Sequence, residues 1–65
     1  MAANKWQKPG PIMNMVFESA LIHLIGPDAK GAIVHSYRDI GAGVIVNYEL
    51  VVDDKLYIGR TTIVE

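Results

Sequence analysis

Residues 43–64 decide the fold: they read Gly-Val-Ile-Val-Asn-Tyr-Glu-Leu-Val-Val (43–52), Asp-Asp-Lys (53–55) and Leu-Tyr-Ile-Gly-Arg-Thr-Thr-Ile-Val (56–64). The two outer runs are rich in β-branched and aromatic residues, which suit strands, and the polar break between them suits a turn. This combination is typical of a β-hairpin. The remainder of the chain must therefore pair with this hairpin or pack on it.

The composition of the turn predicts how the two strands align. A two-residue Asp53-Asp54 loop needs positive φ at both positions, where Asn-Gly or Asp-Gly is much preferred. A loop that also includes Lys55 needs only one left-handed residue, so we predict the three-residue loop. It places Tyr48 opposite Arg60 on a nearly apolar face. The other face of the hairpin then carries Ile45, Asn47, Glu49, Val51, Tyr57, Gly59, Thr61 and Ile63.

Length and composition indicate one small domain that does not fold around a large core of its own. The chain has 65 residues, no cysteine and 51% hydrophobic residues. A chain of this length buries only about 60% of the surface that it exposes when unfolded. Small domains without disulfides often complete their cores by oligomerisation, so we expect a homo-oligomer.

Charge and hydropathy favour some partners over others. The net charge is −1, whereas nucleic-acid-binding domains usually carry a basic excess, so no nucleic-acid partner is predicted. There is no run of 18 apolar residues, the length typical of a membrane span, and no signal-peptide pattern. We therefore expect a cytoplasmic protein without a membrane partner, and we predict no cofactor.

We predict that residues 1–10 form a flexible N-terminal arm and that residues 11–65 form a single domain. Residues 1–10 show no periodicity and end before Pro11 in a Gly-Pro break. Trp6, the only tryptophan, is costly to leave in water and is a residue type favoured in interfaces. We expect it to lie against a neighbouring subunit or another partner.

Residues 11–25 favour a helix. Asn14 and Glu18 are expected on its solvent side, and Gly26 followed by Pro27 is a typical helix end. As a strand, the same stretch alternates imperfectly and exceeds the usual strand length, but it remains the alternative. Apolar residues recur at helical spacing on one arc, at Met13, Val16, Phe17, Ala20, Leu21 and Leu24.

The predicted fold is α+β, with one helix at about 12–25 packed on a three-stranded antiparallel meander at about 32–39, 44–52 and 56–64. The alternative is an all-β four-stranded meander or a barrel-like sheet. A single helix covers one face of such a sheet, and the other face remains partly apolar. We expect a second subunit to contact that face and the arm at Trp6, Ile45, Val51, Tyr57 and Ile63.

No catalytic constellation is evident, and the sequence favours a protein that is not an enzyme. Ser19 and His23 are helical neighbours at four-residue spacing, but no third group is identified to orient the imidazole. Asp53 and Asp54 belong to a turn, where aspartate is common for backbone reasons. The histidines lack the spacing of metal ligands, so no metal site is predicted.

Arg60 breaks the apolar pattern of its strand. Its stem could pack on Tyr48 with the guanidinium in water, or the guanidinium could bind an anion. The candidate ligand-binding residues are Arg60, Tyr48, His35, Tyr37 and Arg38.

Two functions follow as expectations. The first is a small non-catalytic, homo-oligomeric binding or inhibitor-type protein that acts through a sheet face or edge. The second is a protein or enzyme that binds a small anionic molecule in a pocket between subunits. Sequence alone leaves the partner, the ligand and the oligomer symmetry open.

Overall fold

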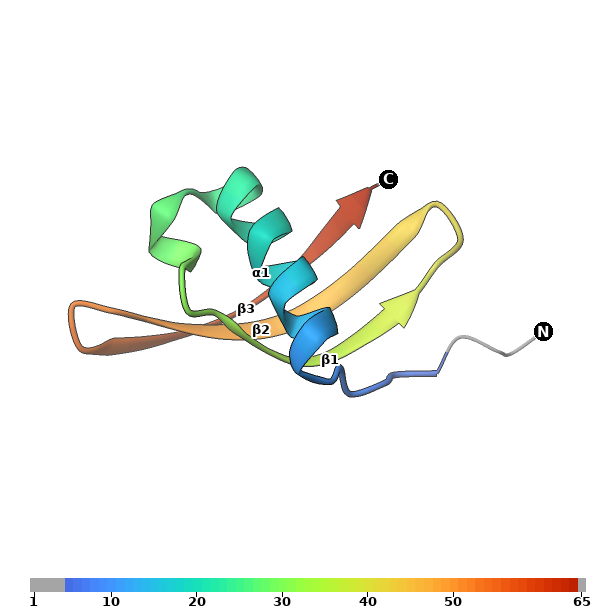
Figure 1. Cartoon of the computed structure of the whole chain (residues 1–65), viewed down its shortest axis with the longest axis horizontal. Helices are drawn as coiled ribbons and strands as arrows, with labels where there is room; N and C mark the ends of the chain where they lie inside the picture. Colours follow the sequence, from blue (N-terminus) through green and yellow to red (C-terminus); the bar gives the residue numbers. More distant parts are fainter. Residues whose placement is uncertain (1–4, 65) are drawn as a thin grey trace.

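A helix packed on one side of an antiparallel sheet forms the fold, and the predicted α+β class is confirmed (Figure 1). The computed structural model describes residues 5–64. The strand order over these residues is β1-β2-β3, with antiparallel pairing throughout. The elements are helix α1 (Pro11–Ile25), the 3-10 turn η1 (Pro27–Ala29) and strands β1 (Ile33–Asp39), β2 (Gly43–Val52) and β3 (Lys55–Val64).

Helix α1 begins and ends where the sequence predicts. Pro11 stands at its first position, where the missing N–H costs no helical hydrogen bond, and the Asn14 N–H donates to the Gly10 carbonyl at 2.9 Å. Gly26 closes the helix with φ +119°, a conformation that favours glycine, and its N–H donates to the Ile22 carbonyl at 2.9 Å. The strand alternative for this segment, and with it the all-β fold, is therefore wrong.

The hairpin turn differs from the prediction. Val52 pairs with Lys55, and both intervening residues are left-handed, with φ +53° at Asp53 and +63° at Asp54. The predicted three-residue loop is therefore wrong. Two left-handed residues give the turn a twist that matches the right-handed twist of the strands, and this advantage outweighs the poor fit of aspartate to positive φ.

The shorter turn shifts β3 by one residue and exchanges its two faces. Tyr48 now lies opposite Gly59, and Asn47 lies opposite Arg60. A Cβ placed on Gly59 would approach the Tyr48 hydroxyl to 2.6 Å, so the tyrosine ring occupies the space above this glycine. An aromatic ring that covers a strand glycine is a known way to fix strand register.

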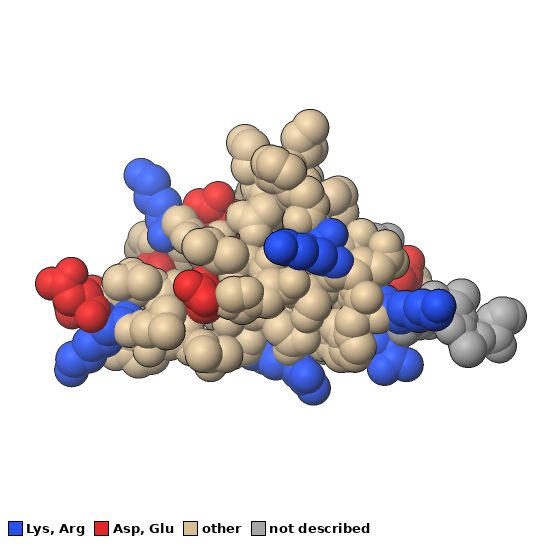
Figure 2. Space-filling model, turned by 90° about the horizontal axis from the view of Figure 1, so that it is seen from below, with Lys and Arg blue, Asp and Glu red and all other residues tan. Residues whose placement is uncertain are grey.

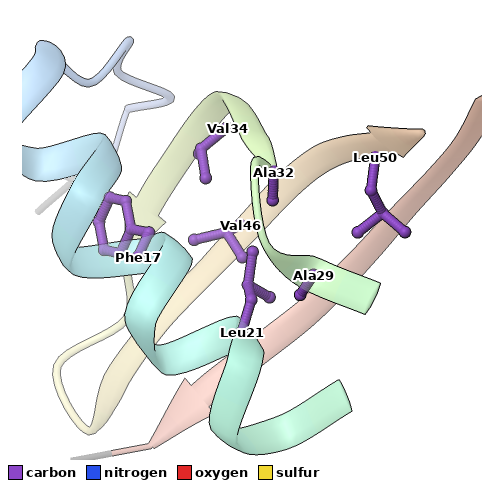
Figure 3. Close-up of a cluster of buried hydrophobic side chains, with 7 residues drawn as sticks. All are labelled: Phe17, Leu21, Ala29, Ala32, Val34, Val46 and Leu50. Carbon is purple, nitrogen blue, oxygen red and sulfur yellow. The ribbon is translucent and has the colours of Figure 1, made fainter. Parts of the chain in front are cut away.

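The core is small and lies between α1 and the sheet (Figure 3). Phe17 and Leu21 enter it from the helix, and Leu21 and Val46 are fully buried. The ring centroid of Tyr37 lies 5.0 Å from that of Phe17, which extends the cluster toward β1. The buried hydrophobic residues are Phe17, Leu21, Ala29, Ala32, Val34, Val46 and Leu50.

Two polar residues of α1 face the sheet, contrary to the prediction that they face solvent. The Asn14 amide donates from Nδ2 to the Ala32 carbonyl at 3.1 Å, and its Oδ1 accepts the Val34 N–H at 2.7 Å. One turn later, Glu18 Oε2 accepts the Gly31 N–H at 2.6 Å. Together they join the helix to the segment that leads into β1.

This orientation rotates α1 away from the predicted apolar arc. Phe17 and Leu21 are buried as expected, but Leu24 is 57% exposed. Backbone groups at the start of β1 need partners, and the side chains that supply them must face the strand. The large apolar residues of α1 that are left exposed are Ile12, Met13, Met15, Val16, Leu24 and Ile25.

The N-terminal arm lies along the edge of β1. Gln7 and Tyr37 exchange two backbone hydrogen bonds of 2.8 Å each, and the Tyr37 hydroxyl donates to Gln7 Oε1 at 3.3 Å. Part of the predicted flexible arm, residues 1–4, lies outside the described residues, and the flexibility of the arm remains a prediction.

The sheet surface that points away from α1 is called the outer face below. The side chains of β1 do not simply alternate between the two faces, because the pairing of β1 with β2 shifts by one residue between Val34 and Ser36. The strand residues of the outer face are Ile33, His35, Ser36, Arg38, Ile45, Asn47, Glu49, Val51, Leu56, Ile58, Arg60, Thr62 and Val64.

Candidate functional site

A row of polar side chains crosses the outer face from β1 to β3. Ser36 pairs with Asn47, and Asn47 pairs with Arg60 in the next strand. Arg60 Nε donates to Asn47 Oδ1 at 2.6 Å, and Asn47 Nδ2 donates to Ser36 Oγ at 2.9 Å. The asparagine thus uses both ends of its amide, and it fixes the orientation of the Arg60 guanidinium.

Trp6 extends this row into a cluster. The Arg60 guanidinium lies 5.2 Å from the centre of the indole ring, and the Arg38 guanidinium lies 5.9 Å from it. Both distances fall within the range of cation–π attraction. We call Trp6, Ser36, Arg38, Asn47 and Arg60 the arginine–tryptophan cluster.

The backbone of the arm explains why Trp6 reaches the outer face. Gln7 is bridged to Tyr37 and lines a groove on the helix side of the sheet. Successive residues of an extended segment point to opposite sides, so Trp6 turns to the outer face. Its side chain remains 42% exposed, and one part of the indole is therefore accessible to a ligand.

The two guanidinium groups retain donors for an anion. Among the described residues, the contact between an acidic side chain and a basic one is the hydrogen bond of His35 Nε2 with Glu49 Oε1 at 2.5 Å, and it involves neither Arg38 nor Arg60. Guanidinium groups bind carboxylate and phosphate oxygens in a planar, often bidentate geometry. The chemistry that the cluster can perform is therefore recognition of an anion beside an aromatic ring.

The five predicted ligand-binding residues lie on two different faces. Arg60, Arg38 and His35 share the outer face. Tyr37 and Tyr48 point to the helix side and pack against the core. The predicted contact between Arg60 and Tyr48 is therefore wrong, because the register shift puts Gly59 opposite the tyrosine.

The aromatic neighbour of Arg60 is Trp6, and the sequence did not reveal that pairing. Ser36 and Asn47 were missed as well, since neither carries a recognisable motif. The bulge in β1 brings Ser36 beside Asn47, and this bulge has no sequence signal that we recognised. The correct hairpin register alone would have placed Asn47 beside Arg60.

The predicted interface residues also divide between the faces. Trp6, Ile45 and Val51 lie on the outer face, whereas Tyr57 is opposite Leu50 and Ile63 lines the groove on the helix side. Their role in an interface remains a prediction. One contact surface that includes all five is excluded, because the sheet separates them.

Beyond the cluster, the outer face becomes apolar toward the hairpin tip. Ile58 is 75% exposed and Val51 is 61% exposed, although both are large aliphatic residues. Glu49 lies among them with His35 as its partner. We call Ile33, Val51, Leu56 and Ile58 the distal patch.

The hairpin tip itself is acidic. Asp53 and Asp54 are exposed, and the hairpin extends beyond the rest of the fold at one end of the long axis (Figure 1). In Figure 2 acidic side chains stand at that same end with a basic side chain beside them, and other charged side chains are spaced over a largely uncharged surface. The molecule measures 42 × 19 × 19 Å, so the tip is well separated from the other end.

A second concave feature lies on the helix side. A groove of about 480 Å³ runs between α1 and the sheet. Met13, Val16, Val44 and Ile63 give it an apolar lining, and Asp39 adds a carboxylate. It contains no histidine or arginine, so it offers no cationic partner for an anion.

Other kinds of site find no support in residues 5–64. No group of three His, Cys, Asp or Glu side chains in this range is arranged to hold a metal ion. Nor is any described helix of sufficient length and apolarity to cross a bilayer. Comparison with protein-family models, with curated proteins and with solved structures finds no match to this chain.

Proposed function

We propose that this chain is a small non-catalytic binding protein that works as a homo-oligomer in the cytoplasm. The observation that best supports the proposal is that few hydrophobic residues are buried while many large hydrophobic residues are exposed. The buried core consists of seven residues, three of which are alanine or valine at the start of β1 and before it. Large aliphatic side chains stand exposed both on α1 and on the outer face.

The exposed apolar residues are grouped rather than scattered, and this grouping favours a contact surface. Single exposed aliphatic residues are ordinary on protein surfaces, but contiguous apolar patches usually mark interfaces. The distal patch gathers four such residues on adjoining strands. A helix that is apolar around most of its circumference is likewise typical of buried helices.

The oligomeric state tests this proposal directly. We expect size-exclusion chromatography with light scattering to give a mass above that of the 7.1 kDa monomer at high micromolar concentration, and dissociation on dilution. Sedimentation velocity should give the same transition. A strict monomer across that range would contradict the proposal.

A second candidate function is the binding of a small anionic molecule. It is favoured by Arg38 and Arg60, which converge on the indole of Trp6. A planar anion such as a nucleotide would gain stacking from the ring and charge-assisted hydrogen bonds from the guanidiniums.

Tryptophan fluorescence provides the measurement for this candidate, because Trp6 is the only tryptophan. Titration with inorganic phosphate, a nucleoside triphosphate and dicarboxylic acids should quench or shift the emission if the cluster binds them. Arg60→Ala should remove the response, and Lys30→Ala, a distant exposed cation, should preserve it. No response to any of the compounds would argue against a small-anion site.

A further inference from the structure

We propose that two copies of the chain pack outer face against outer face, with their strands antiparallel, so that each acidic hairpin tip contacts the arginine–tryptophan cluster of the other copy. The inference rests on the proposed self-association and specifies its geometry. Asp53 and Asp54 of one copy would meet Arg38 and Arg60 of the second.

The positions of tip and cluster along β2 allow this arrangement. Asn47 lies three residues before Leu50, and Asp53 lies three residues after it. At about 3.3 Å per residue, each is about 10 Å from Leu50. A two-fold axis that passes beside Leu50, at right angles to the strands, therefore brings Asp53 of one copy to the level of Asn47 in the other.

The same axis superposes apolar surface on apolar surface. It carries Val51 to the level of Glu49, whose neighbours across the strands are Ile33 and Ile58. Leu56 of one copy thus meets Ile58 of the other, whereas Val51 meets Glu49, so the two distal patches overlap in part. Such self-complementarity is what a two-fold interface requires, since each contact occurs twice.

Glu49 is the acidic strand residue on the outer face, and it does not oppose the arrangement. His35 Nε2 lies 2.5 Å from its Oε1, so the carboxylate has a partner within its own chain. Lys55, beside the tip, pairs with Val52 on the helix side of the sheet. It therefore points away from the cluster that the tip would approach.

The turn supplies an independent argument. Asp53 and Asp54 both hold positive φ, where non-glycine residues are strained, and their like charges are adjacent. No described residue forms an ion pair with either of them. Asparagine and glycine would suit the two turn positions better, so the two adjacent carboxylates at the tip are available for an interaction outside the turn.

The size of the overlap sets the strength of the contact. A stable interface needs about 800 Å² from each partner. The long side of the molecule measures 42 by 19 Å, and the accessible surface of the chain totals 4681 Å². With the axis beside Leu50, the two copies overlap only between the tip and the level of Asn47, about 20 Å along the strands. The buried area therefore stays below that of a standard interface, and we expect a weak dimer with the distal patch near the centre of the contact and the charged groups at both ends.

A charge exchange tests the geometry. One variant carries Asp53→Lys and Asp54→Lys, and the other carries Arg38→Glu and Arg60→Glu. Each alone would place like charges together at both ends of the interface, so each should be monomeric at concentrations where the wild type is dimeric. An equimolar mixture pairs opposite charges at both ends and should restore the dimer.

A variant of the turn separates the loss of the two carboxylates from a loss of folding. Asp53→Asn with Asp54→Gly installs the preferred residues for a turn of this kind, so the hairpin should gain stability. The dimer should nevertheless weaken about tenfold or more, because both carboxylates are lost. Sedimentation velocity measures the dissociation constant, and far-UV circular dichroism verifies the fold of every variant.

The outcomes distinguish the inference from the function on which it rests. A wild type that stays monomeric overturns both. A wild-type dimer that all charge variants retain overturns the inference alone, and points to contact through α1 or the edge of β3. Monomeric variants that fail to form a dimer on mixing also overturn it.

Discussion

At the scale of single residues, the Asn14 side chain forms hydrogen bonds of the kind that a strand usually forms with its neighbouring strand. Its side-chain amide donates to the Ala32 carbonyl and accepts from the Val34 N–H, as a neighbouring peptide group would. The amide thus extends the hydrogen bonding of the sheet to the helix. A helical pattern cannot reveal this role, because polar residues on a helix usually face water.

Asn14→Ala should therefore be more destabilising than a typical polar substitution in a helix. It leaves two backbone groups without their side-chain partner in a part-buried position, and we expect a loss of about 2 kcal/mol in the free energy of unfolding. Urea titration followed by circular dichroism measures it. Ser19→Ala, on the exposed side of the same helix, should change stability by about 0.5 kcal/mol or less. Equal effects of the two substitutions would contradict the role of Asn14.

Phe17 and Leu24 lie on the same predicted arc but have different surroundings. Phe17 is 5% exposed and contacts Tyr37, whereas Leu24 is 57% exposed. Phe17→Ala should cost about 3–5 kcal/mol, enough to unfold a domain of this size or leave it molten. Leu24→Ala should leave the thermal midpoint of the monomer nearly unchanged. A severe effect of Leu24→Ala in dilute monomer would show that the helix is rotated differently.

At the scale of elements, the sequence predicted the helix and the three strands but not how they are aligned. Pro11 and Gly26 bound α1 through backbone chemistry that is local and therefore visible in sequence. Register depends on which side chain fits over which neighbour across the sheet. The Asp53-Asp54 turn violated the usual preference, so the choice based on turn residues was wrong by one position.

Part of the candidate site could be predicted for the same reasons. Arg60 was singled out because its charge interrupts an apolar strand, and Arg38 because it lies on the neighbouring strand; both belong to the cluster. Trp6 was noted as an interface residue but not as their neighbour. Its contact with them depends on the Gln7–Tyr37 bridge, which joins segments thirty residues apart and leaves no local pattern.

Gly59→Ala probes the corrected register. The new Cβ would lie 2.6 Å from the Tyr48 hydroxyl and would displace the ring. Alanine reduces the freedom of the unfolded chain, which offsets part of the cost, and we expect a net loss of about 1 kcal/mol. In a Tyr48→Phe background the loss should persist, because the ring Cζ would still lie 2.7 Å from the new Cβ, whereas in a Tyr48→Ala background it should largely disappear. Stabilisation by Gly59→Ala would argue against the observed pairing.

At the scale of the whole molecule, stability and association should be inseparable. A domain with seven buried hydrophobic residues among those described has little stability in reserve, and any contact made only by the folded form adds to it. The thermal midpoint should therefore rise with protein concentration. Differential scanning calorimetry over a hundredfold dilution series measures this rise. The charge-reversed variants should lose most of it, whereas a midpoint independent of concentration would count against self-association.

The bridge between Gln7 and Tyr37 has a further consequence at this scale. Strand pairing between copies can continue without limit only when both edge strands of the sheet are free. Each added copy must offer a free edge strand to the next copy. Here the arm pairs with the border of β1 at Tyr37, and β3 is the other outermost strand of the described sheet. Strand addition at this border would have to displace the arm. We therefore expect the arm to help protect a chain with so much exposed apolar surface from forming fibrils.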